Sequence, residues 1–95
     1  MHVISKKKLS DFWQKHTESQ RPLVAWFKFV RQSRYKTFHE LRTTFPTVDK
    51  IGKYVVFNID GNKFRLITVV HFNRGKVYVR DILTHPEHGK EKWNS

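Results

Sequence analysis

The sequence contains no cysteine. A disulfide framework, a thiolate zinc site and thiol catalysis are therefore excluded, and the chain is compatible with a reducing compartment. Long apolar runs are also missing, because none follows the basic residues 6–8 near the N-terminus. A signal peptide and a membrane span both require such a run. We therefore expect a cytoplasmic protein that does not bind membranes.

Acidic side chains are scarce: 8 Asp and Glu residues stand against 19 Lys and Arg residues, a formal net charge of +11 at pH 7. This surplus repels itself unless a polyanion or an acidic partner screens it, and it is typical of nucleic-acid-binding proteins. Internal repeats, low-complexity segments and linkers rich in Pro, Gly or Ser are absent. We therefore expect one domain over residues 1–95.

Apolar residues at helical spacing predict two helices after a short strand at Val3 and Ile4. The first helix is expected over residues 6–16, with Ser5 as its N-cap. The second is expected from residue 19 or 20 to residue 33, with Pro22 in its first turn, where a missing N–H costs nothing. A short link makes the two helices antiparallel neighbours. Their stripes are expected to pack in the core, namely Leu9, Phe12, Trp13 and His16 on the first helix and Leu23, Trp26, Phe27 and Val30 on the second.

Runs rich in β-forming residues at 54–59, 63–72 and 76–84 predict three strands. The segments between them, DGN at 60–62 and NRG at 73–75, tolerate positive φ, so both links are expected to be tight hairpins. A brief helical turn is expected at residues 38–43. The sequence therefore predicts an α+β fold with the order β-α-α-β-β-β, in which an antiparallel sheet packs on a helical hairpin.

Several short runs together carry a resemblance to a known family. They are PLVAW at residues 22–26, FNIDGNKFRL at residues 57–66 and VYVR at residues 77–80. With these runs the chain resembles, nearly end to end, the HigB-type toxins of the RelE-like superfamily, which are small ribosome-associated mRNA endonucleases of bacterial toxin–antitoxin pairs. The resemblance implies a compact RelE-like domain.

The resemblance also implies metal-independent cleavage of RNA by its own 2′-hydroxyl. Such cleavage needs a base at that hydroxyl, a cation at the scissile phosphate and an acid at the leaving 5′-oxygen. Arg65 is expected to stabilise the transition state, because the superfamily has a catalytic arginine in this strand. His85 and His88 are expected to serve as base and acid, in an order that stays open. Family members commonly carry tyrosine where His88 stands, so this chain departs from the pattern there.

Further cations and one aromatic residue are candidates for holding the RNA. Cationic side chains bind phosphates, and aromatic rings stack on bases. Tyr78 is the stacking candidate, and the histidines at positions 16, 39 and 71 are interpreted as structural. The run at residues 6–8 is interpreted as a solvated helix start. The expected backbone contacts are Lys53, Lys63, Arg80 and, on the tail, Lys90.

The sequence allows three other interpretations. The segment from His85 to His88 resembles a set of metal ligands, but Arg65 and Arg80 would oppose a dication, so we expect no metal and no cofactor. A double-stranded RNA-binding domain ends in a long helix, whereas only eleven residues follow Thr84. A non-enzymatic RNA- or ribosome-binding domain explains the charge equally well and stays the alternative. The implied partners are mRNA, the ribosome and a HigA-like antitoxin with a helix-turn-helix domain.

Overall fold

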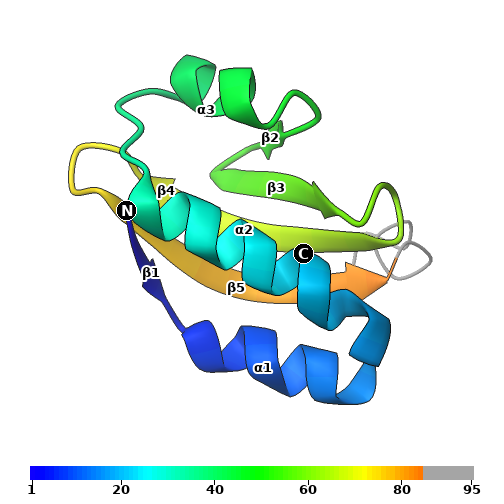
Figure 1. The fold of residues 1–95 in the computed structure, drawn as a ribbon. Helices are drawn as coiled ribbons and strands as arrows, with labels where there is room; N and C mark the ends of the chain where they lie inside the picture. The colour runs from blue at the N-terminus through cyan, green and yellow to red at the C-terminus, as the bar shows by residue number, and fades with distance from the viewer. Residues whose placement is uncertain (85–95) are drawn as a thin grey trace.

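The fold was analysed in a computed structural model that describes residues 1–84 (Figure 1). Its helices and strands follow one another along the chain with short connections. They are β1 (His2–Ile4), α1 (Lys6–Lys15), a 3-10 turn (Thr17–Ser19), α2 (Gln20–Gln32), α3 (Phe38–Thr44), β2 (Asp49–Ile51), β3 (Tyr54–Ile59), β4 (Phe64–His71) and β5 (Lys76–Thr84).

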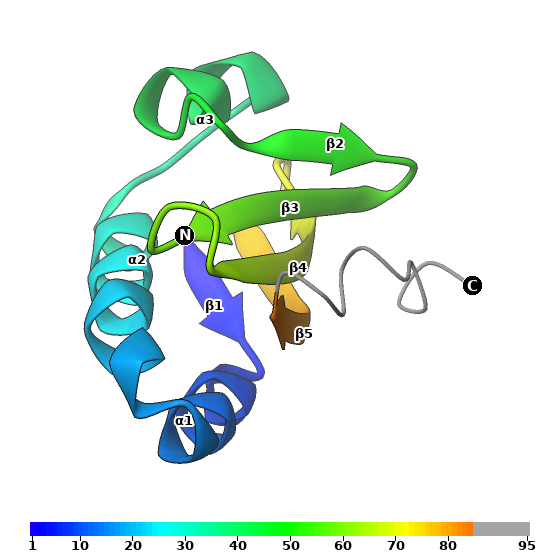
Figure 2. The same ribbon diagram turned by 90° about the vertical axis from the view of Figure 1, so that its right-hand side faces the viewer.

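The strands form one five-stranded sheet in the order β1-β5-β4-β3-β2. Neighbours from β2 to β5 pair antiparallel, whereas β1 pairs parallel with β5. Helices α1 and α2 lie together on one face of this sheet, as Figure 2 shows. We call the opposite face, which α1 and α2 leave uncovered, the open face.

The main core lies between the sheet and the two long helices. Leu9 of α1 and Leu23 of α2 are completely buried. Trp26 packs edge to face on Phe57 of β3, with ring centroids 5.3 Å apart. Removing each such side chain from water contributes about 1.5–3 kcal/mol, so these stripes hold the helices against the sheet. Phe12, Trp13 and Phe27 are partly buried against the same core, which confirms the expectation that the helix aromatics pack inside.

A second, smaller apolar cluster lies on the other side of the sheet. It consists of Val56, Ile67 and Leu83, one from each of β3, β4 and β5. Ile51 and Tyr54 pack against it. Because the side-chain period of a strand is two, these residues point away from the helices. These three buried residues form an apolar patch on the open face, which we call the apolar floor.

The amino group of Met1 joins β1 to the end of α2. It donates hydrogen bonds to the carbonyl oxygens of Val30, at 2.9 Å, and Arg31, at 3.2 Å, and also to that of Ser33. Carbonyls at a helix C-terminus lack partners within the helix, so these contacts satisfy them. Burial, and then the nearby charge of Arg34, lower the pKa of this amino group.

The predicted α+β fold, both long helices and the three long strands are confirmed, with bounds within two residues. The antiparallel meander of β3, β4 and β5 is confirmed, and β1 adds a parallel pair with β5 at one edge of the sheet. Strand β2 at the other edge was missed. It has three residues, of which Asp49 and Lys50 are exposed, so it carries no alternating apolar signal. Ser5 precedes α1 as predicted, but its side chain forms no capping hydrogen bond within the described chain.

The hairpin between β4 and β5 depends on a glycine that a side chain would disturb. Gly75 has φ +65°, and a Cβ there would lie 2.7 Å from a guanidinium nitrogen of Arg34. That guanidinium donates a 2.7 Å hydrogen bond to the Phe72 carbonyl. Gly52 has a similar φ of +59° but open space around its position. The two glycines therefore separate the cost of backbone strain from the cost of displacing Arg34.

We expect Gly52→Ala to lower the free energy of unfolding by about 1–2 kcal/mol, the cost of a left-handed L-residue. Gly75→Ala should cost about 1 kcal/mol more, because Arg34 must also give up its hydrogen bonds. Urea denaturation monitored by tryptophan fluorescence measures both values. In a double-mutant cycle, Arg34→Ala should remove the excess at Gly75. Equal losses at the two glycines would contradict the Arg34 contact.

Candidate nucleic-acid interface

Arg65 lies on the open face of the central strand β4. Its cross-strand neighbours are Asn58 on β3 and Leu83 on β5. Arg65 is half-buried, and its Nε is a buried donor without a hydrogen-bond partner among residues 1–84. The Oδ1 of Asn58 is a buried acceptor that likewise has no hydrogen-bond partner among residues 1–84. An unsatisfied buried polar group costs about 1–3 kcal/mol, and this donor and acceptor belong to cross-strand neighbours on β4 and β3.

Arg80 occupies a β-bulge in β5. On β4, Ile67 pairs with Asp81 while the next residue, Thr68, pairs with Val79, so Arg80 is the extra residue. Its side chain is exposed, and its carbonyl oxygen accepts a 2.9 Å hydrogen bond from Lys8 Nζ of α1. Bulges re-aim a side chain and increase the local twist. Residues 6–8 are exposed, as expected of a solvated helix start, and Lys8 in addition supports the bulge. This contact joins residues far apart in the chain, so no local pattern indicates it.

A cavity of about 260 Å³ lies beside this bulge and is lined by Lys53, Val69, His71, Tyr78 and Arg80. We call it the basic pocket. The rings of His71 and Tyr78 meet edge to face, with centroids 5.0 Å apart and an interplanar angle of 61°. Lys53 Nζ lies 5.4 Å from the ring centroid of Tyr54 at the edge of the same region. The structure thus brings together three of the predicted RNA-binding residues and adds His71, which the sequence analysis had interpreted as structural.

Lys63 lies apart from the basic pocket, on the turn between β3 and β4. Its Nζ is 3.6 Å from a carboxylate oxygen of Asp60, and both side chains are exposed. Such a surface pair contributes at most about 1 kcal/mol, so it leaves Lys63 available to another anion.

Three predicted residues, His85, His88 and Lys90, lie outside the described residues. The alternative metal ligands between His85 and His88 lie there as well. Within residues 1–84 no group of three or more His, Asp or Glu side chains is placed to hold a metal ion. The last described residue, Thr84, pairs with Phe64, the neighbour of Arg65 on β4.

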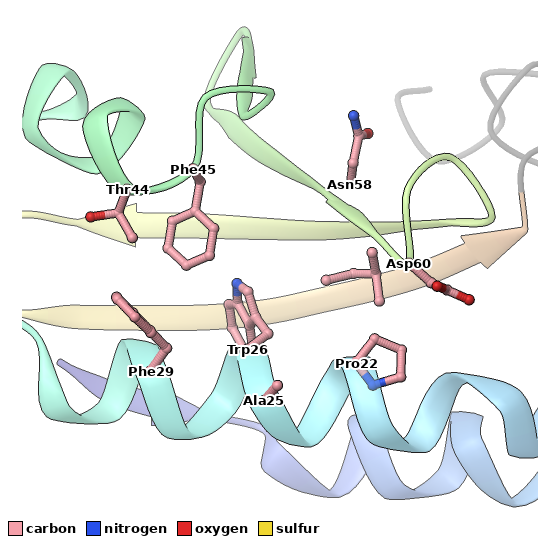
Figure 3. Close-up of a pocket in the computed structure, with 9 residues that line it drawn as sticks. Pro22, Ala25, Trp26, Phe29, Thr44, Phe45, Asn58 and Asp60 are labelled. Atoms are coloured by element: carbon pink, nitrogen blue, oxygen red, sulfur yellow. The ribbon is translucent and has the colours of Figure 1, made fainter.

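A larger cavity of about 360 Å³ lies on the other side of the molecule, between α2, the end of α3 and β3. Figure 3 shows Trp26 and Phe29 of α2 facing Phe45 across it. Phe29 is 51% exposed, and Phe45 packs edge to face on it. No lysine or arginine lines this cavity. It therefore lacks the fixed positive charge that a phosphate backbone requires, and the open face is the better candidate.

No helix within residues 1–84 is long and apolar enough to cross a membrane.

Comparison with known proteins identifies the family. Residues 19–91 match the model of HigB_toxin, described as the RelE-like toxic component of a toxin-antitoxin system. The chain is 33% identical over 91 residues to the mRNA interferase toxin HigB of Escherichia coli (strain K12), covering 93% of this chain and 88% of that relative. The same values hold for the mRNA interferase HigB of Shigella flexneri. The mRNA interferase HigB of Escherichia coli O6:H1 is 28% identical over 93 residues, covering 95% of this chain and 90% of that relative.

These matches confirm the resemblance drawn from the sequence, and a toxin of this kind implies an antitoxin as its partner. The chain belongs to the HigB family of RelE-like toxins of toxin–antitoxin systems.

Proposed function

We propose that this protein is an endoribonuclease toxin that cleaves mRNA on translating ribosomes and thereby stops protein synthesis. The relatives from Escherichia coli and Shigella flexneri are named mRNA interferases. The observation that carries the proposal is Arg65, a half-buried cation on the open face whose Nε has no partner among the described residues. The Nε itself has almost no exposed area, so the terminal nitrogens of the guanidinium are the donors proposed to meet a phosphate, whose oxygens match their planar fork.

The proposed reaction needs no metal. A base removes the proton of the ribose 2′-hydroxyl, and the 2′-oxygen attacks the adjacent phosphorus. The bond from phosphorus to the 5′-oxygen breaks, and an acid protonates that leaving oxygen. The products are a 2′,3′-cyclic phosphate, or its hydrolysis product, and a free 5′-hydroxyl. Arg65 stabilises the negative charge that accumulates on the phosphate oxygens, since its planar fork offers two parallel donors.

His85 and His88 are the proposed base and acid, because imidazole gains and loses a proton near neutral pH. The last described residue, Thr84, pairs with Phe64, which precedes Arg65 on β4. His85 is the next residue in the sequence. This connectivity supports a role for His85 in particular.

The cations around Arg65 are proposed to hold the RNA backbone. Lys53 and Arg80 line the basic pocket, and Lys63 lies on the turn that precedes β4. Tyr78 is proposed to stack on a base, and Lys90 to add a further phosphate contact. None of these contacts requires a particular sequence, which suits an enzyme whose substrate is many messages.

The antitoxin is proposed to be a HigA-like protein with a helix-turn-helix domain that neutralises the toxin in the cytoplasm. The net charge of +11 supports an acidic contact surface on that partner, because complementary charge accelerates association and suppresses wrong partners.

Arg65→Ala should lower the rate of message cleavage by about 100- to 1000-fold, the usual cost of removing one donor that stabilises a transition state. The measurement is 3′-end mapping of a reporter mRNA in a purified translation system. Arg21→Ala is the matched control, since it removes the same charge from an exposed position on α2, away from the open face. Codon-phased cuts with cyclic-phosphate ends are expected from the wild type and the control.

Intact message with slowed translation would instead identify a non-enzymatic ribosome-binding domain. Equal losses of cleavage in Arg65→Ala and Arg21→Ala would also contradict the proposed role of Arg65, because bulk charge would then explain the effect.

Lys53→Ala and Arg80→Ala should each weaken binding to RNA and reduce its dependence on salt. Each lost phosphate contact lowers the slope of log affinity against log salt by about 0.7 for single strands. Fluorescence anisotropy with 2′-O-methyl RNA, which lacks the attacking hydroxyl, measures binding without cleavage. Lys28→Ala on α2 is the control, and its slope should match that of the wild type. An unchanged slope in Lys53→Ala would exclude that contact.

His85→Ala should reduce cleavage by about 100- to 10,000-fold without weakening RNA binding, as expected for a proton-transfer group. His39→Ala removes an exposed histidine on α3 and should leave the rate unchanged. The pH dependence of the wild-type rate provides a second readout, since one limb of the profile should disappear with His85. A variant that retains both limbs would transfer the role to another group.

A further inference from the structure

The basic pocket has the size of a site for one base rather than for a larger ligand. Its volume is about 260 Å³, just below the roughly 300–1000 Å³ of sites for drug-sized molecules. Its walls combine the apolar Val69, the aromatic ring of Tyr78 and the imidazole of His71. A flat, partly polar ring matches this lining better than a fully polar ion does.

The charge of the pocket selects an anionic ligand. Two cations line it from different parts of the fold. Lys53 lies on the turn before β3, and Arg80 lies at the bulge of β5. No described residue that lines it is acidic. A base that carries a phosphate on each side satisfies both requirements, since its ring meets the aromatic wall while its phosphates meet the cations.

His71 adds a group that can distinguish one base from another. The neutral imidazole offers one hydrogen-bond donor and one acceptor on the same ring. Its ring meets that of Tyr78 edge to face and is half-buried, so its orientation is held by packing. Proteins recognise single-stranded RNA by stacking its bases on aromatic rings and by hydrogen bonds to the exposed base edges. Tyr78 and His71 supply these two elements side by side.

The pocket also lies at a fixed distance from Arg65. Along β4, Arg65, Ile67, Val69 and His71 alternate onto the open face, and Val69 pairs with Tyr78. Four residues of a strand span about 13 Å, so the pocket is separated from the phosphate at Arg65 by more than one side chain. The apolar floor at Ile67 fills the space between them. A base in the pocket therefore belongs to a nucleotide removed from the cleaved bond, at an offset that the sheet fixes.

From these observations we propose that the basic pocket binds a nucleobase of the message at a fixed offset from the cleavage site, and that His71 determines which base is preferred there. The proposal rests on the proposed function in that the ligand is the RNA that the toxin cleaves. Tyr78 supplies the stacking surface, and Lys53 and Arg80 hold the flanking phosphates.

The test is deep sequencing of the cut sites that each variant makes in a randomised message in the purified translation system. Wild-type protein should show a base preference at one fixed offset from the cut. His71→Ala should flatten that preference while the total rate stays within about five-fold of the wild type. Tyr78→Ala should lower the total rate about ten-fold or more, because stacking on one base contributes about 1–3 kcal/mol. Tyr78→Phe retains the ring, so its loss of rate should be smaller than that of Tyr78→Ala.

His39→Ala is the matched control, and its preference should be that of the wild type. Thermal unfolding of His71→Ala and His71→Gln shows whether each variant still folds. Either variant that folds tests the base preference, because any change then comes from the lost contact and not from unfolding. A preference that survives in both histidine variants, or one that His39→Ala also loses, overturns the proposal. So does a uniform loss of rate in His71→Ala with an unchanged preference.

A second measurement does not depend on cleavage. Titration of the protein with 2′-O-methyl oligoribonucleotides of single-base composition, followed by NMR of the histidine imidazoles, should shift the His71 signals and leave those of His39 in place. Shifts of different size for different bases support the proposal even if the protein cuts no message, an outcome that would reject the nuclease alone. Signals of His71 that stay unmoved by every oligonucleotide would reject the pocket.

Discussion

The arrangement depends on the burial of one face of the sheet by two helices. The stripes of α1 and α2 remove Leu9, Leu23 and Trp26 from water against β3, β4 and β5. Because successive residues of a strand alternate between faces, this burial also determines the residues of the opposite face. Arg65, Val69 and Tyr78 lie on the open face because their neighbours Leu66 and Val79 belong to the main core cluster and Val70 packs against it. A register shift of one residue would exchange the two sets and destroy both the core and the site.

Cations crowd the open face, and an apolar floor separates them. Ile67 is buried in the second cluster between the position of Arg65 and the basic pocket, and Leu83 of the same cluster lies directly across from Arg65 on β5. The floor gives the face a stable surface, whereas a sheet face lined only with lysine and arginine would repel itself. It also fixes the spacing of the charged groups, because strands cannot slide past one another without exposing these apolar side chains. A rigid spacing is what an enzyme needs if it is to cut at one position relative to a bound base.

The bulge at Arg80 links the helical side of the molecule to this site. Lys8 on α1 donates a hydrogen bond to the carbonyl oxygen that the bulge leaves outside the ladder. The N-terminal basic run thus has a structural contact as well as a solvated surface. Through this hydrogen bond, α1 helps to hold Arg80, which lines the basic pocket, although α1 carries no proposed catalytic residue.

The sequence alone determined the α+β class, both long helices, the three long strands and the glycine-containing turns. The spacing of apolar residues and the residue types in turns are local properties, so they can be read without knowing which distant residues are in contact. The sequence also supported the family through the FNIDGNKFRL run, and with it the expectation for Arg65. Only the tertiary structure decided which strands are neighbours. The parallel pairing of β1 with β5, the edge strand β2 and the contact of Lys8 with Arg80 all join residues far apart in the chain. The pocket that makes His71 a candidate depends in the same way on β4 lying beside β5 and on the turn before β3. Alternation alone assigns His71 to a face, but the pairing of strands decides which side chains surround it.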